Sequence, residues 1–226
     1  MTLFDKQIYH YIALIFLVLG VYALADGTAL FGQLWGVPTS AWLWLSVAVP
    51  VLHQVYVWFA WRSQLKYSLI SRIFGGSGFK VYTIGFTVLF ASRLIFIILL
   101  SLSNKDSIVL SPGFSYVLSI IFIVLSGYLF YSVRTYFGFK RAYGIDHFDE
   151  SYRHLPFVRE GIFKYTSNAM YTFGFLILWV PGLIFFSKAA LLAACFNHTY
   201  IWVHYYTTEL PDIRLIYGSP GNREQS

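Results

Sequence analysis

Long apolar runs separated by short polar segments dominate the sequence. Four of these runs lie at about 8–26, 40–61, 80–102 and 113–137. Each is long enough to cross a bilayer core of about 30 Å as a helix. The pattern therefore predicts four membrane-spanning helices in the first part of the chain.

A fifth apolar run, residues 169–206, is too long for one crossing. It is interrupted by the polar break "FFSKAA", and Pro181-Gly182 lies just before that break. Such residues favour a turn, so we predict a tight hairpin of two helices at about 169–186 and 189–208. The expected fold is an all-α integral membrane protein with about six transmembrane helices.

The composition agrees with a membrane protein. The chain has 226 residues, of which 58% are hydrophobic and 12% are charged. A soluble domain would carry about twice that charged fraction. The mean hydropathy of +0.62 points the same way.

The positions of the 16 Lys and Arg residues predict the topology. With the N-terminus inside, only Lys105 and Lys188 fall in outside loops, and Arg93 falls within the third span. The others lie in inside segments, an asymmetry typical of cytoplasmic loops. We therefore expect both termini to lie in the cytoplasm. The membrane is expected to be a bacterial inner membrane or that of the endoplasmic reticulum, with the active site facing the cytoplasm. The net charge of +6 then reflects topology and anionic lipid, not nucleic acid.

The N-terminal run also has features of a signal peptide. Ala23-Leu24-Ala25 resembles a cleavage site, but Asp5 weakens the basic region that such peptides carry. We expect this run to be the first span.

The chain is expected to divide into three parts. Residues 1–137 form a four-span membrane part, residues 138–218 combine a cytoplasmic loop with the hairpin, and residues 219–226 form a flexible tail. The loop, residues 138–168, should form short amphipathic pieces at the membrane surface. A hairpin places its free ends side by side, so the end of this loop should meet the end of the last helix.

Glu209 is followed closely by Pro211, which a helix does not easily accommodate. We therefore expect Glu209 at a helix C-terminus, where the macrodipole is already negative. A carboxylate there needs a cation or several donors. The partner is either a surface arginine, Arg214 or Arg159, or a cationic ligand.

The segment "GIFKYTSNAMYTFGF", residues 161–175, leads into the hairpin, and "TTELPD" leaves it. This arrangement resembles the membrane-embedded methyltransferases, namely the phosphatidylethanolamine N-methyltransferases and the isoprenylcysteine carboxyl methyltransferases. The residues that carry the resemblance are Gly161, Phe163, Tyr165, Asn168, Met170, Tyr171, Gly174, Glu209, Tyr217 and Gly218. The chain departs from the pattern at Ala169, where proline is usual, and at Thr208, where a second glutamate is common.

The resemblance implies a cytoplasmic pocket for S-adenosylmethionine, built without a Rossmann domain, and a lipid-like acceptor. A phospholipid amine is the favoured acceptor, and no metal is expected. A carboxylate and aromatic faces suit the cationic cofactor. The expected cofactor-binding residues are Tyr165, Asn168, Met170, Tyr171, Gly174, His198, Glu209 and Asp212.

An ammonium acceptor must lose a proton before it can attack a methyl group. His204, near the cytoplasmic end of the last helix, is the favoured base, with Glu209 as a second catalytic residue. The alternatives are His198, His147, His154 and Asp146. Alternatively, His204 is an interfacial histidine that only makes hydrogen bonds.

Polar residues inside the spans are functional candidates by default. His53 either lines a headgroup pocket or bonds to a neighbouring helix, and Arg93 is expected to snorkel outward. "GIDHFDE", residues 144–150, is interpreted as a solvated turn in preference to a substrate loop.

Three other functions stay open. One is an NADPH-dependent membrane reductase resembling the steroid 5α-reductases, for which "HTYIWVHYY" and "LPDIR" are the relevant segments. Another is methyl transfer to an isoprenylcysteine carboxylate or a thiol. The third is a non-enzymatic membrane protein. The sequence does not specify an oligomeric state.

Overall fold

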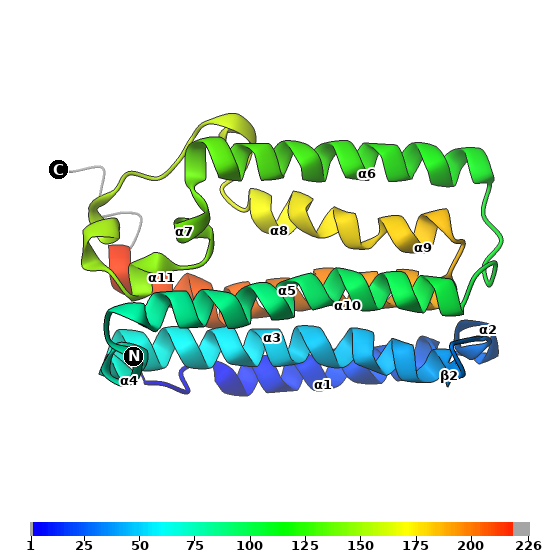
Figure 1. Cartoon of the computed structure of the whole chain (residues 1–226), viewed down its shortest axis with the longest axis horizontal. Coiled ribbons are helices and arrows are strands. Elements are labelled where there is room, and N and C mark those ends of the chain that lie inside the picture. The colour runs from blue at the N-terminus through cyan, green and yellow to red at the C-terminus, as the bar shows by residue number, and fades with distance from the viewer. Residues whose placement is uncertain (1, 219–226) are drawn as a thin grey trace.

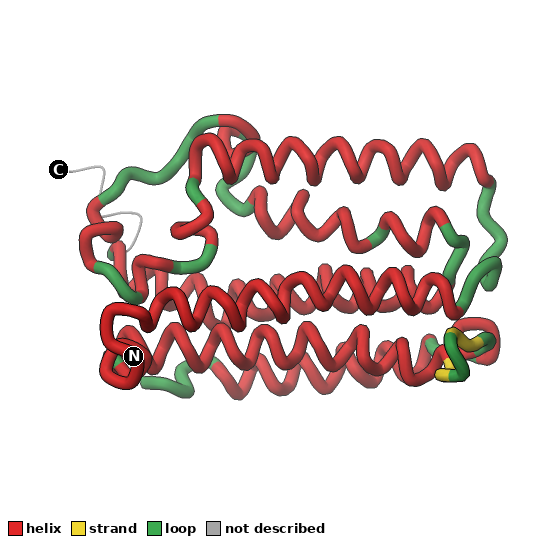
Figure 2. Tube along the Cα trace, in the orientation of Figure 1, coloured by secondary structure: helices red, strands yellow, loops and turns green. Residues whose placement is uncertain are grey.

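The computed structural model describes residues 2–218, which form a bundle of helices with one short two-stranded ribbon (Figures 1 and 2). The helices are α1 (Gln7–Leu24), α2 (Gly27–Leu30), α3 (Thr39–Tyr67), α4 (Leu69–Phe74), α5 (Gly78–Ser103), α6 (Pro112–Ser132), α7 (Phe139–Ala142), α8 (Ala169–Gly174), α9 (Val180–Ile184), α10 (Lys188–His204) and α11 (Leu210–Tyr217). The strands β1 (Gln33–Leu34) and β2 (Val37–Pro38) pair antiparallel.

Four helices are long and apolar enough to cross a membrane: Gln7–Leu24, Thr39–Tyr67, Leu69–Ser103 and Pro112–Phe137. They match the first four predicted spans. The predicted hairpin is present as a shorter apolar helical segment, Ala169–Ile184, followed by α10. A count of six crossings, with both termini in the cytoplasm, stays a prediction.

The predicted loop, residues 138–168, folds as short helical pieces, as expected. The predicted flexible tail, residues 219–226, lies outside the described residues. In Figure 1 this loop and α11 lie at the end of the bundle where α1 begins. The polar connections of the C-terminal half therefore gather at that end.

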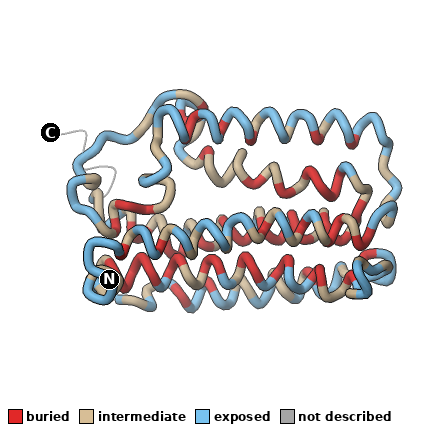
Figure 3. Tube along the Cα trace, in the orientation of Figure 1, coloured by how far each residue is buried: buried red, intermediate tan, exposed pale blue. Residues whose placement is uncertain are grey.

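Packing divides the helices into inner and outer members. α3 packs against α5 and α10, α1 packs against α10, and α6 packs against α8 and α9. Figure 3 shows extensive burial along α3 and α10, whereas much of α6 is exposed. The exposed side chains of α1 and α6 include large apolar residues such as Phe16 and Ile120. Such surfaces suit contact with lipid.

Pro50 lies inside α3, where it has no N–H to donate to the carbonyl of Ser46 one turn earlier. Asn197 of α10 supplies the missing donor, because its Nδ2 donates to the Ser46 carbonyl oxygen at 3.2 Å. The same amide donates to the Ala193 carbonyl at 2.9 Å. A side chain of one helix thus completes the backbone hydrogen bonding of another.

Pro211 does not end the last helix, so the prediction of a helix C-terminus at Glu209 is wrong. α10 passes through a π-helical segment, Tyr205–Glu209, directly into α11. The wider turn accommodates Pro211 in the first turn of α11, a position that proline favours. Glu209 therefore lies at a π-bulge within a continuous helical rod.

The carbonyl that Pro211 leaves without its usual donor is that of Thr207, and it is also satisfied from elsewhere. Arg62 of α3 donates to it from Nη2 at 2.9 Å, and Gln7 of α1 donates from Nε2 at 3.4 Å. The π-bulge is therefore held by side chains from the first and third helices.

We expect Asn197→Leu to lower the free energy of unfolding by about 1–3 kcal/mol, because it leaves the Ser46 carbonyl buried without a donor. In a Pro50→Ala background, residue 50 regains its N–H, so the same substitution should cost less. Thermal unfolding in detergent measures the cost of Asn197→Leu in each background. Thr199→Val is the control, because Thr199 is exposed on the same helix. Equal costs in the two backgrounds would contradict this account.

Candidate functional site

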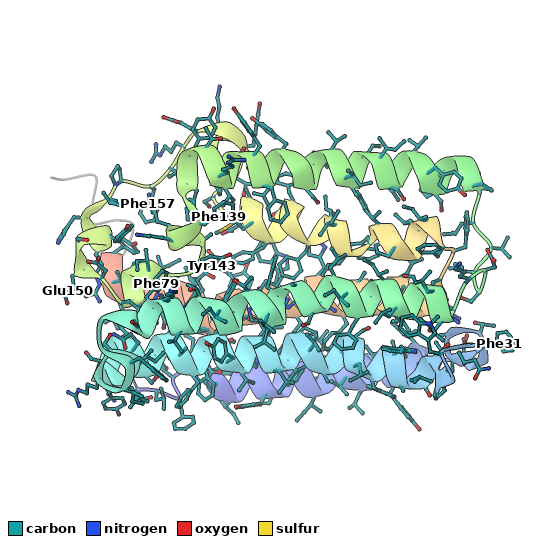
Figure 4. All side chains as sticks on the ribbon, in the orientation of Figure 1. Phe31, Phe79, Phe139, Tyr143, Glu150 and Phe157 are labelled. Atoms are coloured by element: carbon teal, nitrogen blue, oxygen red, sulfur yellow. The ribbon has the colours of Figure 1, made fainter. Side chains whose placement is uncertain are left out.

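A cavity lies between α3, α5, α6, α8 and the end of α10. It offers about 160 Å³ to the centres of water-sized molecules, roughly ten times what one water requires. Phe139 and Tyr143 line it from the α7 segment and are labelled in Figure 4. The walls are mainly aromatic and aliphatic, with a few polar groups.

Five predicted site residues line this cavity together: Met170, Tyr171, Gly174, His204 and Glu209. The Tyr171 hydroxyl donates a hydrogen bond to Glu209 Oε2, which joins α8 to the π-bulge. A Cβ at Gly174 would lie 2.9 Å from Leu129 Cδ2, so a side chain there would have to displace that methyl group. The structure therefore brings these five residues together around one carboxylate, and their roles stay a prediction.

The other predicted cofactor residues do not line the cavity. Tyr165 is 75% exposed, and Asn168 directly precedes α8. His198 accepts a hydrogen bond from Trp179 Nε1 at 3.2 Å, which fastens α10 to the other arm of the hairpin. Asp212 is fully buried and pairs with arginine.

Burial raises the pKa of Glu209 to about 8, and the negative charge of Asp146 contributes in the same direction. Because its pKa is raised, Glu209, which lies just beyond the predicted sixth span, does not readily ionise near neutral pH without a cationic partner. A bound cation would favour the carboxylate, so this position suits a positively charged ligand.

Behind Glu209 lies a buried chain of charged groups. Arg62 Nε donates to Asp212 Oδ1 at 3.1 Å, and Asp212 Oδ2 lies 3.5 Å from His147 Nε2. His147 Nδ1 in turn lies 3.0 Å from Asp146 Oδ1. The Tyr217 hydroxyl donates to Asp146 Oδ2 at 2.8 Å. The chain of charged groups links α3, the loop of residues 138–168 and α11.

Burial alone would lower the pKa of His147, but the carboxylates of Asp146 and Asp212 outweigh it and raise that pKa to about 9. Burial likewise opposes ionisation of Asp146, yet its bonds to His147 and Tyr217 lower its pKa overall. His147 is therefore an imidazolium at neutral pH. Its contribution to stability is full below about pH 6.5 and is lost as the pH rises through about 9.

The segment 144–150 is therefore not simply a solvated turn, and that interpretation is wrong. Ile145 and His147 are buried, and the His147 ring stacks on Trp61 with centroids 4.4 Å apart. Gly144 makes this approach possible: its φ is +77°, and a Cβ there would lie 2.6 Å from the Trp61 ring. The loop packs into the end of the bundle instead of lying in solvent.

Arg93 and His53 line the inner part of the cavity. Arg93 is only 2% exposed, so the prediction that it snorkels outward is wrong. Its guanidinium lies over the Phe175 ring, 5.5 Å from the centroid. Neither ring nitrogen of His53 has a hydrogen-bond partner. Polar groups thus occur at both ends of an otherwise apolar space.

The cavity also reaches the side of the bundle. Phe90 of α5 and Phe130 of α6 both line it, yet they are 41% and 43% exposed. Both helices carry apolar outer faces of membrane-spanning length. This part of the cavity wall therefore lies next to the region where lipid chains would lie.

Sequence reasoning missed the roles of Arg62 and His147. Arg62 was assigned to a loop, but α3 continues to Tyr67 and buries it. No local pattern reveals this burial, because its partners lie in the N-terminal segment and at the far end of the chain. The burial of Arg93 had a signal in the sequence, because a charged residue within a predicted span usually faces the interior of the helix bundle or a cavity.

We expect Asp212→Asn to lower the free energy of unfolding by about 3–5 kcal/mol, because it leaves the buried Arg62 without its carboxylate. Glu150→Gln is the matched control. Its carboxylate is 82% exposed and pairs with Arg153 at the surface, so its loss should cost at most about 1 kcal/mol. Chemical denaturation in detergent compares the two. Similar losses would show that the buried pair has no special role.

A family model described as Phospholipid methyltransferase matches residues 114–220. No curated protein matches the chain, and no solved structure matches it. The matched region runs from α6 through the hairpin to the end of α11 and includes both Tyr171 and Glu209. The resemblance indicated by the motifs is thereby confirmed: over these residues the chain is similar to the phospholipid methyltransferase family, and the match supports a membrane methyltransferase.

Proposed function

We propose that the protein transfers a methyl group from S-adenosylmethionine to a lipid-like acceptor, with a phospholipid amine as the favoured acceptor. The observation that carries the proposal is the half-buried Glu209 carboxyl, bonded to Tyr171 and lining a cavity within the family-matched region. S-adenosylmethionine carries a sulfonium and an ammonium. Either cation would offset the cost of ionising Glu209.

The residues around Glu209 suit this cofactor. Tyr171 and Tyr143 offer aromatic faces, which attract cations. Gly174 keeps the wall of α8 free of a side chain. S-adenosylmethionine supplies an electrophilic methyl group when bound, and these residues bind and orient it. Tyr165, Asn168, His198 and Asp212 do not line this cavity and are not proposed to touch the methyl donor.

An amphipathic acceptor is proposed to enter from the bilayer beside Phe90 and Phe130, which line the cavity and are also exposed on the outer surface. Its apolar part would remain among aromatic side chains, and its nucleophile would approach the cofactor from the membrane side. Burial of that apolar part supplies binding energy without a polar partner. The cofactor and the acceptor then occupy opposite ends of one cavity.

His204 is proposed to accept the proton from an ammonium acceptor. It is buried, lines the cavity, and its Nδ1 has no hydrogen-bond partner. S-adenosylmethionine would supply the methyl group to the free amine and would leave as the neutral thioether. His204 would hold the proton that the ammonium loses and would then release it to water.

The reductase alternative fits the site less well. A nicotinamide dinucleotide carries anionic phosphates, which need cationic or backbone N–H partners. Glu209 is the acidic group at the mouth of the cavity, and Asp146 lies close enough to raise its pKa. The one Lys or Arg among the residues that line the cavity is Arg93, at the inner end, so phosphates at the Glu209 end would have no cationic side chain to bind.

S-adenosylmethionine should bind to the purified protein more tightly as the pH rises from about 6.5 to about 8. The cation favours ionised Glu209, so below its pKa of about 8 binding must release a proton. Isothermal titration at several pH values measures this. Glu209→Gln is the control that removes the proton-linked part and leaves only the titration of the ligand itself. Identical pH profiles for the two proteins would exclude the role of Glu209.

Labelled S-adenosylmethionine incubated with the protein and a lipid extract should give a labelled lipid. We expect His204→Gln to lower the rate about 10²–10⁴-fold, as for loss of a general base. Cys195→Ser, an exposed position on the same helix, should have no effect. Absence of label with every lipid fraction would overturn the proposal, and full activity of His204→Gln would remove that residue from it.

A further inference from the structure

The inner part of the cavity contains a cation that no carboxylate of residues 2–218 neutralises. Arg93 lies fifteen residues after the start of α5, about 22 Å along the helix at 1.5 Å per residue. Its Nη2 is 3.5 Å from the Pro50 carbonyl oxygen, a weak contact. Its Nε and Nη1 have no hydrogen-bond partner.

No carboxylate pairs with this guanidinium. The five ion pairs among the described residues involve Arg62, His147, Arg153 and Lys188, but not Arg93. The Phe175 ring offers only the partial compensation of a cation–π contact. A buried charge without an anionic partner costs several kcal/mol, and within a membrane span such charges face cavities or substrate paths.

His53 adds two more unsatisfied polar atoms to the same region. Its ring lies against Phe86, with centroids 4.6 Å apart, and neither nitrogen is bonded. Both His53 and Arg93 line the cavity, and the surrounding wall is aromatic. The region therefore offers hydrogen-bond donors for an acidic group and apolar surface for the rest of the same molecule.

The contacts of the two ends of the cavity come from neighbouring positions of the hairpin. Phe175, which contacts Arg93, lies four residues after Tyr171, which bonds to Glu209. That separates the two residues by about 6 Å along the helical axis. A ligand bound at Arg93 would therefore lie on the same wall of the cavity as the Tyr171–Glu209 pair.

We propose that Arg93, assisted by His53, binds the acidic group of the acceptor, a phosphate or a carboxylate carried on an apolar body. That the bound molecule is the methyl acceptor rests on the proposed function, whereas the binding of the anion does not. Arg93 is then a specificity-determining residue: it selects acidic amphipaths over neutral ones and sets how deeply they enter.

The test measures binding of three matched probes, dodecyl phosphate, dodecanoate and dodecanol, to the full chain in a neutral detergent. We expect at least one of the two anions to bind about tenfold or more tightly than the alcohol. Arg93→Gln should abolish that preference, and Arg93→Lys should keep part of it. Arg134→Gln removes the same charge from an exposed position on the cytoplasmic side of α6 and should change nothing.

Equal binding of all three probes to the native protein, or an unchanged preference in Arg93→Gln, would overturn the proposal. Competition by inorganic phosphate distinguishes a site for a free anion from a site for an acidic amphipath. If inorganic phosphate displaces the bound probe at a similar concentration, the site binds a free anion. If it does not displace the probe, the site requires the apolar chain as well. Binding of S-adenosylmethionine is measured on every variant. Normal binding of S-adenosylmethionine to Arg93→Gln would show that this variant is folded. If the native protein keeps the anion preference but does not bind S-adenosylmethionine, the methyltransferase proposal is refuted and the anion site is not.

Discussion

The buried guanidinium of Arg62 is the interaction on which the candidate site depends. It donates to Asp212, to the Thr207 carbonyl beside Pro211, and to the carbonyls of Leu3 and Asp5. A single side chain thus ties the N-terminal segment and α3 to the π-bulge. Because the bulge carries Glu209, the position of that carboxylate depends on a residue from a different part of the chain. Removing one partner would leave an uncompensated charge in a dry environment.

The same principle recurs where prolines interrupt helices. Pro50 and Pro211 each leave a carbonyl without its usual donor, and each carbonyl is satisfied by a side chain of another helix. In lipid, water cannot serve as the substitute partner. These prolines therefore fix how α3 and α10 pack together, and that packing in turn shapes the wall of the cavity.

Much of the fold followed from hydropathy alone. The four long helices and the hairpin appear close to their predicted residues, because span length and apolarity are local properties. The motif around Tyr171 and Glu209 also meets as predicted, since a hairpin brings its ends together. Continuation of the helix through Pro211 could not be predicted, because it depends on Arg62 and Gln7, roughly 150 and 200 positions away. The burial of His147 and Arg93 likewise reflects tertiary packing that no local pattern encodes.

The family match covers α6 to α11, whereas His53, Arg62 and Arg93 come from α3 and α5. The cavity therefore has walls of two origins: the matched half provides the Tyr171–Glu209 pair, and the unmatched half provides the deep polar groups. Such a division separates two kinds of evolutionary change. Under the proposed function, substitutions in α3 and α5 would alter which molecules are admitted and would leave the Tyr171–Glu209 pair of the other half unchanged, so new selectivity could arise without rebuilding the reactive centre.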